Sequence, residues 1–312
     1  MKKNVFFAAA FILVATGAMA QSNTSTVDQA GRRQEATVTQ NGASNASNVE
    51  QRNRDNSATV FQNGSSNQSE ILQIQRAINN TASATQMGDD NTAIQHQGGD
   101  AKANRAEIMQ SGDRNSAEQY QTYNSYENTA SISQSGEDNA AIQVQSFTSA
   151  NNSATITQVG DANIAGQTQT NISLGNTAII SQDGSTNTAS QNQNDISAFN
   201  SATITQVGNL NDASQFQEAL SGANTAVITQ NGDFNYAVQD QSFISGLNEA
   251  SMTQSGEGNN GFQTQTLGAD LTATLTQTGN SNFSDQYQTG NGHTTTVSQM
   301  GNNNGAIVTQ GN

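Results

Sequence analysis

The sequence predicts an all-β fold: a β-solenoid with two parallel strands per repeat of ~24 residues, in which two facing parallel sheets form a cross-β stack. Three observations lead to this prediction. A block Gln-x-Gly-x-x-Asn-x5-Gln recurs twelve times between Gln40 and Gln310, with eight consecutive spacings of 24 residues. Inside each block, regular side chains alternate with variable ones at a period of two, as in a β-strand. The chain of 312 residues contains no Pro, which suits strands whose amides must donate to a ladder.

The first twenty residues differ from the rest and predict a secretory signal peptide. Lys2 and Lys3 precede an apolar run over residues 5–14, and Ala18-Met19-Ala20 has the small residues of a cleavage site between Ala20 and Gln21. A membrane anchor would need about 20 apolar residues, which is more than this run provides. We therefore expect an exported chain with a short flexible segment over residues 21–33 and a solenoid of twelve repeats over 34–312.

Composition and charge exclude several classes of protein. Only 32% of the residues are hydrophobic and 5% aromatic, which is too few for an ordinary oily core. Without Lys2 and Lys3, the ten basic residues fall to eight against 25 acidic ones, a net charge of −17. Nucleic acid is therefore excluded as an expected partner. The absence of Cys means that no disulfide would trap the chain folded before a further export step.

Each repeat is expected to form strand, tight turn, strand and looser turn. In the sixth repeat, the tight turn lies at residues 159–162 and the looser one at 170–175. The first arm sends Asn152, Ala154, Ile156 and Gln158 to one face, and the second sends Asn163, Ala165, Gln167 and Gln169. This face is the regular one in all repeats, so we expect it to point inward, with the variable face in solvent.

Three rows of inward amides are expected to form hydrogen-bonded ladders, because an unpaired buried amide costs about 1–3 kcal/mol. The first row is Gln40, Gln62, Gln86, Gln110, Gln134, Gln158, Gln182, Gln206, Gln230, Gln254, Gln277 and Gln299. The second is Asn45, Asn67, Asn91, Asn115, Asn139, Asn163, Asn187, Asn211, Asn235, Asn259, Asn282 and Asn304. The third is Gln51, Gln73, Gln97, Gln121, Gln145, Gln169, Gln193, Gln217, Gln241, Gln265, Gln288 and Gln310. The tight turns contain glycines that tolerate a positive φ: Gly42, Gly64, Gly88, Gly112, Gly136, Gly160, Gly184, Gly208, Gly232, Gly256, Gly279 and Gly301.

These positions resemble the curlin repeat, Ser-x5-Gln-x-Gly-x-x-Asn-x-Ala-x-x-x-Gln, over residues 34–312. Two departures occur. The leading Ser is Asn in nine repeats, from Asn56 to Asn248. An extra inward Gln occurs at Gln95, Gln119, Gln143, Gln167, Gln191, Gln215, Gln239, Gln263 and Gln286. The resemblance implies a two-strand β-solenoid that forms bacterial curli amyloid, export through an outer-membrane secretion pore, nucleation by a nucleator subunit, and growth into a biofilm fibre that serves surface adhesion. It also implies that residues 21–33 target the chain for export, although no motif there matches residue by residue.

The ends of the array favour a polymer. The last repeat finishes at Gln310-Gly311-Asn312 with no expected cap, and Arg32 and Arg33 are the only charged residues that would guard the first repeat. Open ends of matching cross-section would accept another copy, and head-to-tail contacts that do not close give a filament. We therefore expect a secreted, extracellular fibre subunit whose main partner is itself.

Other functions remain as alternatives. An enzyme is not expected, since His96 and His293 lie in different repeats, and no cofactor or metal is expected. Acidic turns such as Gly88-Asp89-Asp90 could stack their carboxylates into a calcium-binding edge, but the ordinary preference of turns for Asp also explains them. Outward Thr-x-Thr pairs such as Thr155/Thr157 suit an ice binder, and a solenoid that stays monomeric suits an adhesin. A minor, fibre-nucleating subunit would have the same fold.

Overall fold

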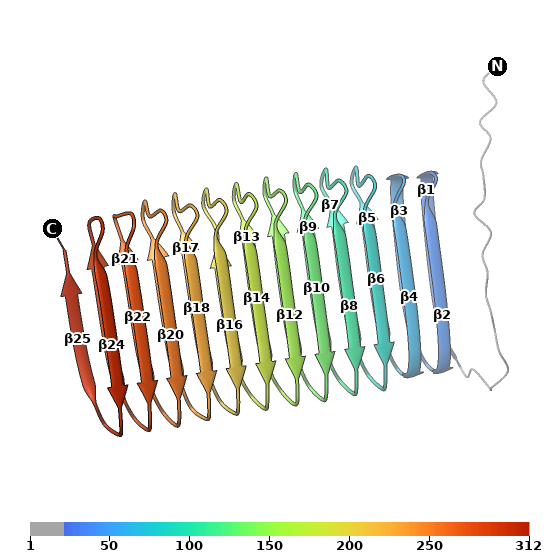
Figure 1. Cartoon of the computed structure of the whole chain (residues 1–312). Coiled ribbons are helices and arrows are strands. Elements are labelled where there is room, and N and C mark those ends of the chain that lie inside the picture. Colours follow the sequence, from blue (N-terminus) through green and yellow to red (C-terminus); the bar gives the residue numbers. More distant parts are fainter. Residues whose placement is uncertain (1–21, 312) are drawn as a thin grey trace, which may run out of the picture.

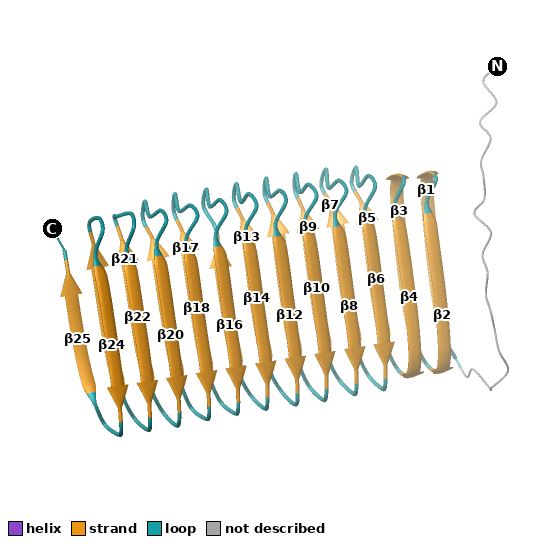
Figure 2. Ribbon diagram, viewed as in Figure 1, coloured by secondary structure: helices purple, strands orange, loops and turns teal. Residues whose placement is uncertain are grey.

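The computed structural model describes residues 22–311, and every regular element in this range is a β-strand. The strands stack side by side into a flat-sided rod, with the first strands at one end and the last at the other (Figure 1). Figure 2 shows strands joined by turns along two long edges. Within residues 22–311 there is no helix of the length and apolarity needed to cross a membrane.

Alternate strands belong to opposite sheets. The thirteen-stranded sheet, called the odd sheet, has the order β1-β3-β5 and onward to β25, and the twelve-stranded even sheet runs from β2 to β24. The odd strands are β1 (Thr24–Arg32), β3 (Ala46–Arg54), β5 (Gln68–Ile74), β7 (Thr92–Gly98), β9 (Ser116–Thr122), β11 (Ala140–Ser146), β13 (Ile164–Thr170), β15 (Thr188–Gln193), β17 (Asp212–Glu218), β19 (Tyr236–Ser242), β21 (Asn260–Thr266), β23 (Phe283–Thr289) and β25 (Gly305–Gln310). The even strands are β2 (Glu35–Ala43), β4 (Ser57–Ser65), β6 (Thr81–Met87), β8 (Arg105–Ser111), β10 (Thr129–Ser135), β12 (Ser153–Val159), β14 (Thr177–Asp183), β16 (Ser201–Val207), β18 (Thr225–Asn231), β20 (Glu249–Ser255), β22 (Thr272–Thr278) and β24 (Thr294–Met300).

All strand pairs are parallel, and equivalent residues of successive repeats are partners. Between β12 and β14, for example, Ile156 pairs with Ile180 and Gln158 with Gln182. The predicted two-strand, two-sheet β-solenoid is therefore confirmed. Every repeat forms one rung, and at most inward positions like residues stack on one another, as the glutamines do.

The core lies between the two sheets and combines apolar side chains with buried Asn and Gln amides. Ile156 and its equivalents in the inner even strands are fully buried, and the inward alanines of the inner strands are also buried. The inward face is thus the one that the sequence analysis predicts. In one repeat a larger core residue is matched by a smaller one on the facing strand. Met252 replaces Ile in β20, and the facing position in β21 is Gly261, where a Cβ would lie 2.7 Å from the Met252 Sδ.

The two edges of the solenoid are different. We call the turns that follow even strands the glycine edge, because each has four residues and a positive-φ glycine, such as Gly160 with φ 100°. We call the turns that follow odd strands the loop edge. Loop-edge turns have six residues in the middle of the chain, as at 170–175, and only four at 30–33, 52–55 and 289–292.

The expectation of a flexible segment over residues 21–33 is wrong for Thr24–Arg32. These residues form β1, which pairs in register with β3 across nine residue pairs, so the solenoid begins at residue 24 rather than 34. The cause is visible in the sequence, where Asn23, Ser25, Val27 and Gln29 have the spacing of an inward arm. Asn23 accepts from the backbone amide of Asn45 at 2.9 Å, and Gln29 donates to Gln51 at 2.6 Å. The predicted signal peptide and its cleavage site at Ala20 and Gln21 lie outside the described residues.

Candidate functional site

The predicted Gln row of the even sheet forms one continuous ladder from Gln40 to Gln299. Each amide Nε2 donates to the Oε1 of the Gln one rung further on, at 2.8–3.0 Å. The second Nε2 proton goes to a backbone carbonyl of the preceding odd strand, as from Gln158 to Ala140 O at 3.0 Å. Every rung therefore satisfies the buried amide of its neighbour.

The odd sheet contains the matching ladder from Gln51 to Gln310. Its Nε2-to-Oε1 distances are 2.7–3.3 Å, and the longest joins Gln288 to Gln310 in the last rung. The extra inward Gln row forms a further ladder over Gln95–Gln286, with distances of 2.8–2.9 Å. In β1, β3 and β5 that position is apolar instead, with Val27, Val49 and Ile71.

The Asn row from Asn45 to Asn304 joins the core to the glycine edge. Asn163 donates through Nδ2 to the carbonyl of Gly184 at 2.8 Å and to Asn139 Oδ1 at 3.1 Å. Its own Oδ1 accepts from the backbone amide of Asn187 at 3.0 Å. The glycines are required by this stacking, because a Cβ on Gly160 would lie 2.1 Å from the carbonyl oxygen of Gly184.

The structure adds a ladder partner that the sequence reasoning missed. Along the loop edge, the buried Asn row from Asn56 to Asn248 offers each Oδ1 to the backbone amide of the next rung, at 2.8–3.0 Å. Buried serines accept from its Nδ2 groups, as Ser173 does from Asn176 at 2.8 Å. The sequence does contain a pattern that could have indicated this contact. In six repeats a Ser lies three residues before the leading Asn, at Ser125, Ser149, Ser173, Ser197, Ser221 and Ser245.

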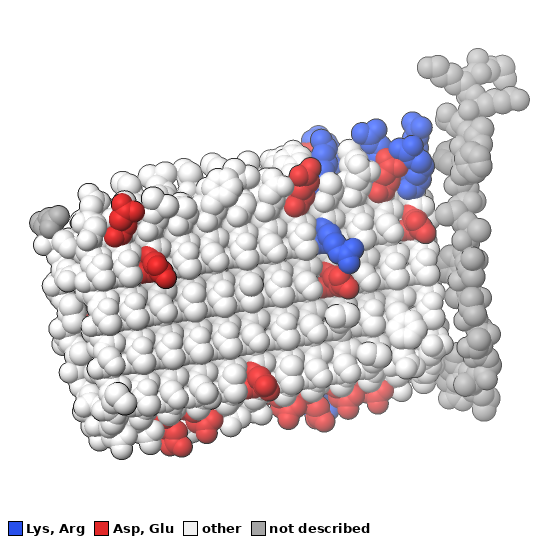
Figure 3. Space-filling view, in the orientation of Figure 1, with Lys and Arg blue, Asp and Glu red and all other residues white. Residues whose placement is uncertain are grey.

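The acidic turns of the glycine edge use their carboxylates as hydrogen-bond acceptors. Oδ1 of Asp113 accepts from the backbone amide of Asp89 at 2.9 Å, and Asp161 accepts from Glu137 at 3.0 Å. Asn209 and Asn302 occupy the same position and accept in the same way. Figure 3 shows acidic side chains gathered along one long edge. The turn position therefore selects Asp or Asn because both link one turn to the preceding one.

The basic residues are confined to the N-terminal half of the chain, since none follows Arg114. Arg114 donates to Asp138 and to Glu137 in the next turn, at 2.7 Å each, and this contact lowers the pKa of the Asp138 carboxyl. Arg33 holds the pKa of Asp55 below its usual value in the same way. Near the loop edge a carboxyl pKa is shifted upward instead. Burial, together with the nearby Asp195 and Asp240 carboxylates, raises the pKa of Glu218.

The histidines do not form a catalytic arrangement with each other. His96 lies on the outward face of β7, half-buried against the edge of the Tyr120 ring, and burial lowers its pKa. His293 replaces the leading Asn before β24, and its carbonyl accepts from Thr272 as the Asn carbonyls do. Among residues 22–311, no three His, Asp or Glu side chains lie close enough together to hold a metal ion.

The two terminal rungs are incompletely covered. Within residues 22–311, β1 and β25 each pair with a neighbour on one side only, as do β2 and β24 in the even sheet. The inward apolar residues of these strands, Val27, Ala36, Ala306 and Val308, are only partly buried, although their equivalents in inner rungs are fully buried. Both ends therefore present open backbone edges and unfinished ladders of the same pattern.

This arrangement defines a parallel two-sheet β-solenoid whose interior is built on stacked amides. The family model named the curlin associated repeat matches residues 127–160, 248–279 and 268–299. These matched segments contain curlin-associated repeats, as the sequence resemblance indicated. No curated protein matches the sequence.

Proposed function

We propose that the chain is a structural subunit that polymerises head-to-tail into extracellular, curli-type amyloid fibres of a biofilm matrix. The observation that carries the proposal is the pair of open ends. β1 and β25 leave unpaired amides and carbonyls in the odd sheet, and β2 and β24 do so in the even sheet. A parallel strand edge of this kind is a template for another copy of the same strand pattern.

The ladders support growth at these ends. Gln310 accepts from Gln288, and Gln299 accepts from Gln277. Among residues 22–311, neither row has a further Gln stacked beyond these two. A second copy whose Gln29 or Gln40 lies on the next rung would complete each row with the bond that every inner rung makes. Each joint would then bury the four partly exposed apolar residues of the terminal strands.

The role of the protein within a fibre system follows from the same proposal. A fibre subunit of this family would need two partners: an outer-membrane pore for export and a nucleator subunit that primes assembly. Twelve near-identical rungs supply fibre length, which favours the major structural subunit over a nucleator. Surface adhesion would be a property of the assembled fibre.

The test is incubation of residues 21–312 at neutral pH, followed by electron microscopy, thioflavin fluorescence and sedimentation. We expect unbranched fibres. A matched protein with a charged, Pro-containing segment appended after Asn312 should be blocked at one end, and mixing it with the parent should shorten the fibres. A stable, monodisperse rod in both samples would contradict the proposal and favour a monomeric adhesin or ice binder.

A further inference from the structure

The numbers of strands in the two sheets constrain how copies join. The odd sheet has thirteen strands and the even sheet twelve, so the described solenoid both starts and ends in the odd sheet. Because the chain alternates between sheets, the strand position that follows β25 along the spiral lies in the even sheet, next to β24. Whatever occupies that position determines the orientation of the next copy.

A second copy has two ways to dock. In a same-sheet joint, its β1 lies on β25, and its β2 then lies two rung spacings from β24, about 9.6 Å instead of about 4.8 Å. One strand position stays empty, and the backbone edge of β24 has no partner. In a half-turn joint, the new copy is rotated by half a turn about the solenoid axis. Its β1 then lies on β24 and its β2 on β25, and every position is filled.

We propose that successive copies are joined by a half-turn, so that the odd sheet of one copy continues the even sheet of the next. This inference rests on the head-to-tail polymerisation proposed above and specifies its geometry. Rotation about the axis exchanges the two sheets and reverses each strand. Because odd and even strands run in opposite directions, all pairs across the joint remain parallel.

The inward side chains of the terminal odd strands fit this joint. Inner odd strands carry Gln at the third inward position, from Gln95 to Gln286, whereas even strands carry an aliphatic residue or Ala there. The odd strands at the two ends follow the even-sheet pattern, with Val27 in β1 and Val308 in β25. In the half-turn joint Val27 lies on Val297 of β24, and in the same-sheet joint it would lie on Val308, so this residue suits both joints and the turns and Gln34 distinguish them. A Gln at position 27 would place a buried amide on Val297 with no ladder partner.

The turns of the two edges have the same length near the ends of the solenoid. In the middle of the chain the loop edge has six-residue turns and the glycine edge four-residue turns, so exchanging the edges would mismatch them. The turn at 30–33 has four residues and a positive-φ glycine, Gly31, whose Cβ would lie 1.8 Å from the carbonyl oxygen of Asn53. In the half-turn joint this turn lies on the four-residue turn at 300–303, and Gly31 continues the row that ends at Gly301.

An unsatisfied amide lies at the same joint. Both side-chain amide atoms of Gln34 are buried and have no hydrogen-bond partner. Gln34 immediately precedes β2, and in the half-turn joint it lies on Asn304, which immediately precedes β25. Asn304 donates through Nδ2 to Asn282 and to the carbonyl of Met300, which leaves its Oδ1 to accept from the next rung. In the same-sheet joint Gln34 would face the empty strand position.

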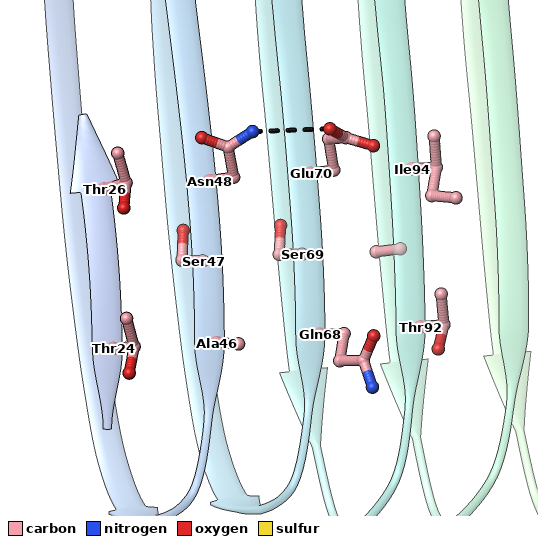
Figure 4. Close-up of a pocket in the computed structure, with 11 residues that line it drawn as sticks. Thr24, Thr26, Ala46, Ser47, Asn48, Gln68, Ser69, Glu70, Thr92 and Ile94 are labelled. Atoms are coloured by element: carbon pink, nitrogen blue, oxygen red, sulfur yellow. Dashed lines mark hydrogen bonds between the residues drawn. The ribbon is translucent and has the colours of Figure 1, made fainter. Parts of the chain in front are cut away.

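Cysteine cross-linking distinguishes the two joints, because the natural chain has no Cys. Thr26 in β1, Thr296 in β24 and Ile307 in β25 are exposed on the outward faces, and Figure 4 shows Thr26 on the outer face of the odd sheet. Adjacent strands place equivalent Cα atoms about 4.8 Å apart, which a disulfide can span. The half-turn joint predicts disulfide-linked multimers in oxidised fibres of Thr26→Cys/Thr296→Cys and none in Thr26→Cys/Ile307→Cys.

Each outcome is decisive when fibres are first verified by electron microscopy. Normal fibres that cross-link only through Thr26→Cys/Ile307→Cys, or through neither pair, would overturn the half-turn joint. Absence of fibres in the unsubstituted protein would instead defeat the proposed function itself. A second measurement uses Val27→Gln and Val308→Gln. The half-turn joint predicts that the double variant elongates more slowly than either single one, whereas a same-sheet joint predicts recovery because the two new amides would stack on each other.

Discussion

The two edges of the solenoid carry the same chain between the same two sheets but obey different constraints. On the glycine edge, all twelve turns have four residues, and the glycine carbonyl of each turn from Gly64 to Gly301 accepts a hydrogen bond from a ladder Asn. On the loop edge, turn length varies from four to six, and large apolar residues such as Phe199 and Phe243 are more than 60% exposed. The glycine edge therefore keeps one turn geometry throughout, while the loop edge keeps its Asn row but varies in turn length.

Backbone conformation shows the same contrast. The glycine edge places glycine where φ is 98–135°, a region that side chains rarely adopt. The loop edge places Ile172, Ile196 and Ile244 at φ 60–67°, which is unfavourable for β-branched residues. The glycine edge therefore restricts one turn position to glycine, whereas its last turn position and the loop edge both accept other residues at positive φ, such as Thr186 at 59°. The following predictions test this difference, from the largest expected effect to the smallest.

The largest effect is expected from adding a methyl group to the glycine edge. Gly160→Ala would force a Cβ to within 2.1 Å of the Gly184 carbonyl oxygen at φ 100°, so we expect a loss of about 3 kcal/mol or more in unfolding free energy. Gly222→Ala on the loop edge is the matched control, because no atom lies within 3.5 Å of its Cβ position. It should change stability by less than about 0.5 kcal/mol in chemical denaturation. Equal costs for the two variants would show that the edges do not differ.

The next effect concerns the two Asn rows. Asn163→Leu should leave the Gly184 carbonyl and the amide of Asn187 unpaired, at about 1–3 kcal/mol each. Asn176→Leu on the loop edge leaves the amide of Asn200 without its acceptor but frees no glycine carbonyl, and Leu271 already occupies the equivalent buried position before β22. We therefore expect it to cost less than Asn163→Leu. Outward Thr155→Ala is the control for a substitution that touches neither row. A lower denaturation midpoint for Asn176→Leu than for Asn163→Leu would contradict this reasoning.

A smaller effect is expected from the carboxyl groups at the two edges, with opposite signs. Arg114 lowers the pKa of Asp138, so that contact stabilises the fold at neutral pH and is lost as the pH falls through the folded-state pKa. Burial raises the pKa of Glu218, so its ionisation costs stability, and this cost appears as the pH rises above the carboxyl range. Thermal melting at neutral pH should show Asp138→Asn less stable and Glu218→Gln more stable than the parent. Both differences should shrink near pH 3; differences that persist there would have another origin.

The smallest effect is expected from relieving strain on the loop edge. Ile172 is 55% exposed and has φ 67°, so Ile172→Asn loses little packing and gains a residue suited to that conformation. We expect a gain of up to about 1 kcal/mol in unfolding free energy. Thr186, at φ 59° on the glycine edge, offers the matched Thr186→Asn variant. A marked destabilisation by Ile172→Asn would mean that this side chain has a structural contact that its exposure does not suggest.

The sequence alone predicted the strands and inward ladders of the twelve repeats, but not β1 or the hydrogen bonds made in the turns. The repeat period and the alternation of Ala154, Ile156 and Gln158 fix the strands, the inward face and the ladders, because identical rungs must satisfy one another. β1 was not found because Thr24–Arg32 lack the preceding Gln-x-Gly turn on which the repeat pattern is anchored. The hydrogen bonds of Asp113 and Asp161 were also missed, since turn preference alone explains Asp there. They depend on the distance between adjacent turns, which only the stacked structure provides.

The mass per unit length of the fibre tests the central claim most directly, because it reports whether each chain stacks on itself. Rungs formed within one chain predict one copy of the mature protein per roughly 60 Å of protofilament, from about 12.5 rungs at about 4.8 Å each. Scanning transmission electron microscopy of fibres of residues 21–312, with the protofilament number counted in the same images, gives this value. One copy per single rung spacing would contradict the account, because each chain would then lie flat in one layer and the solenoid would not be the fibre unit.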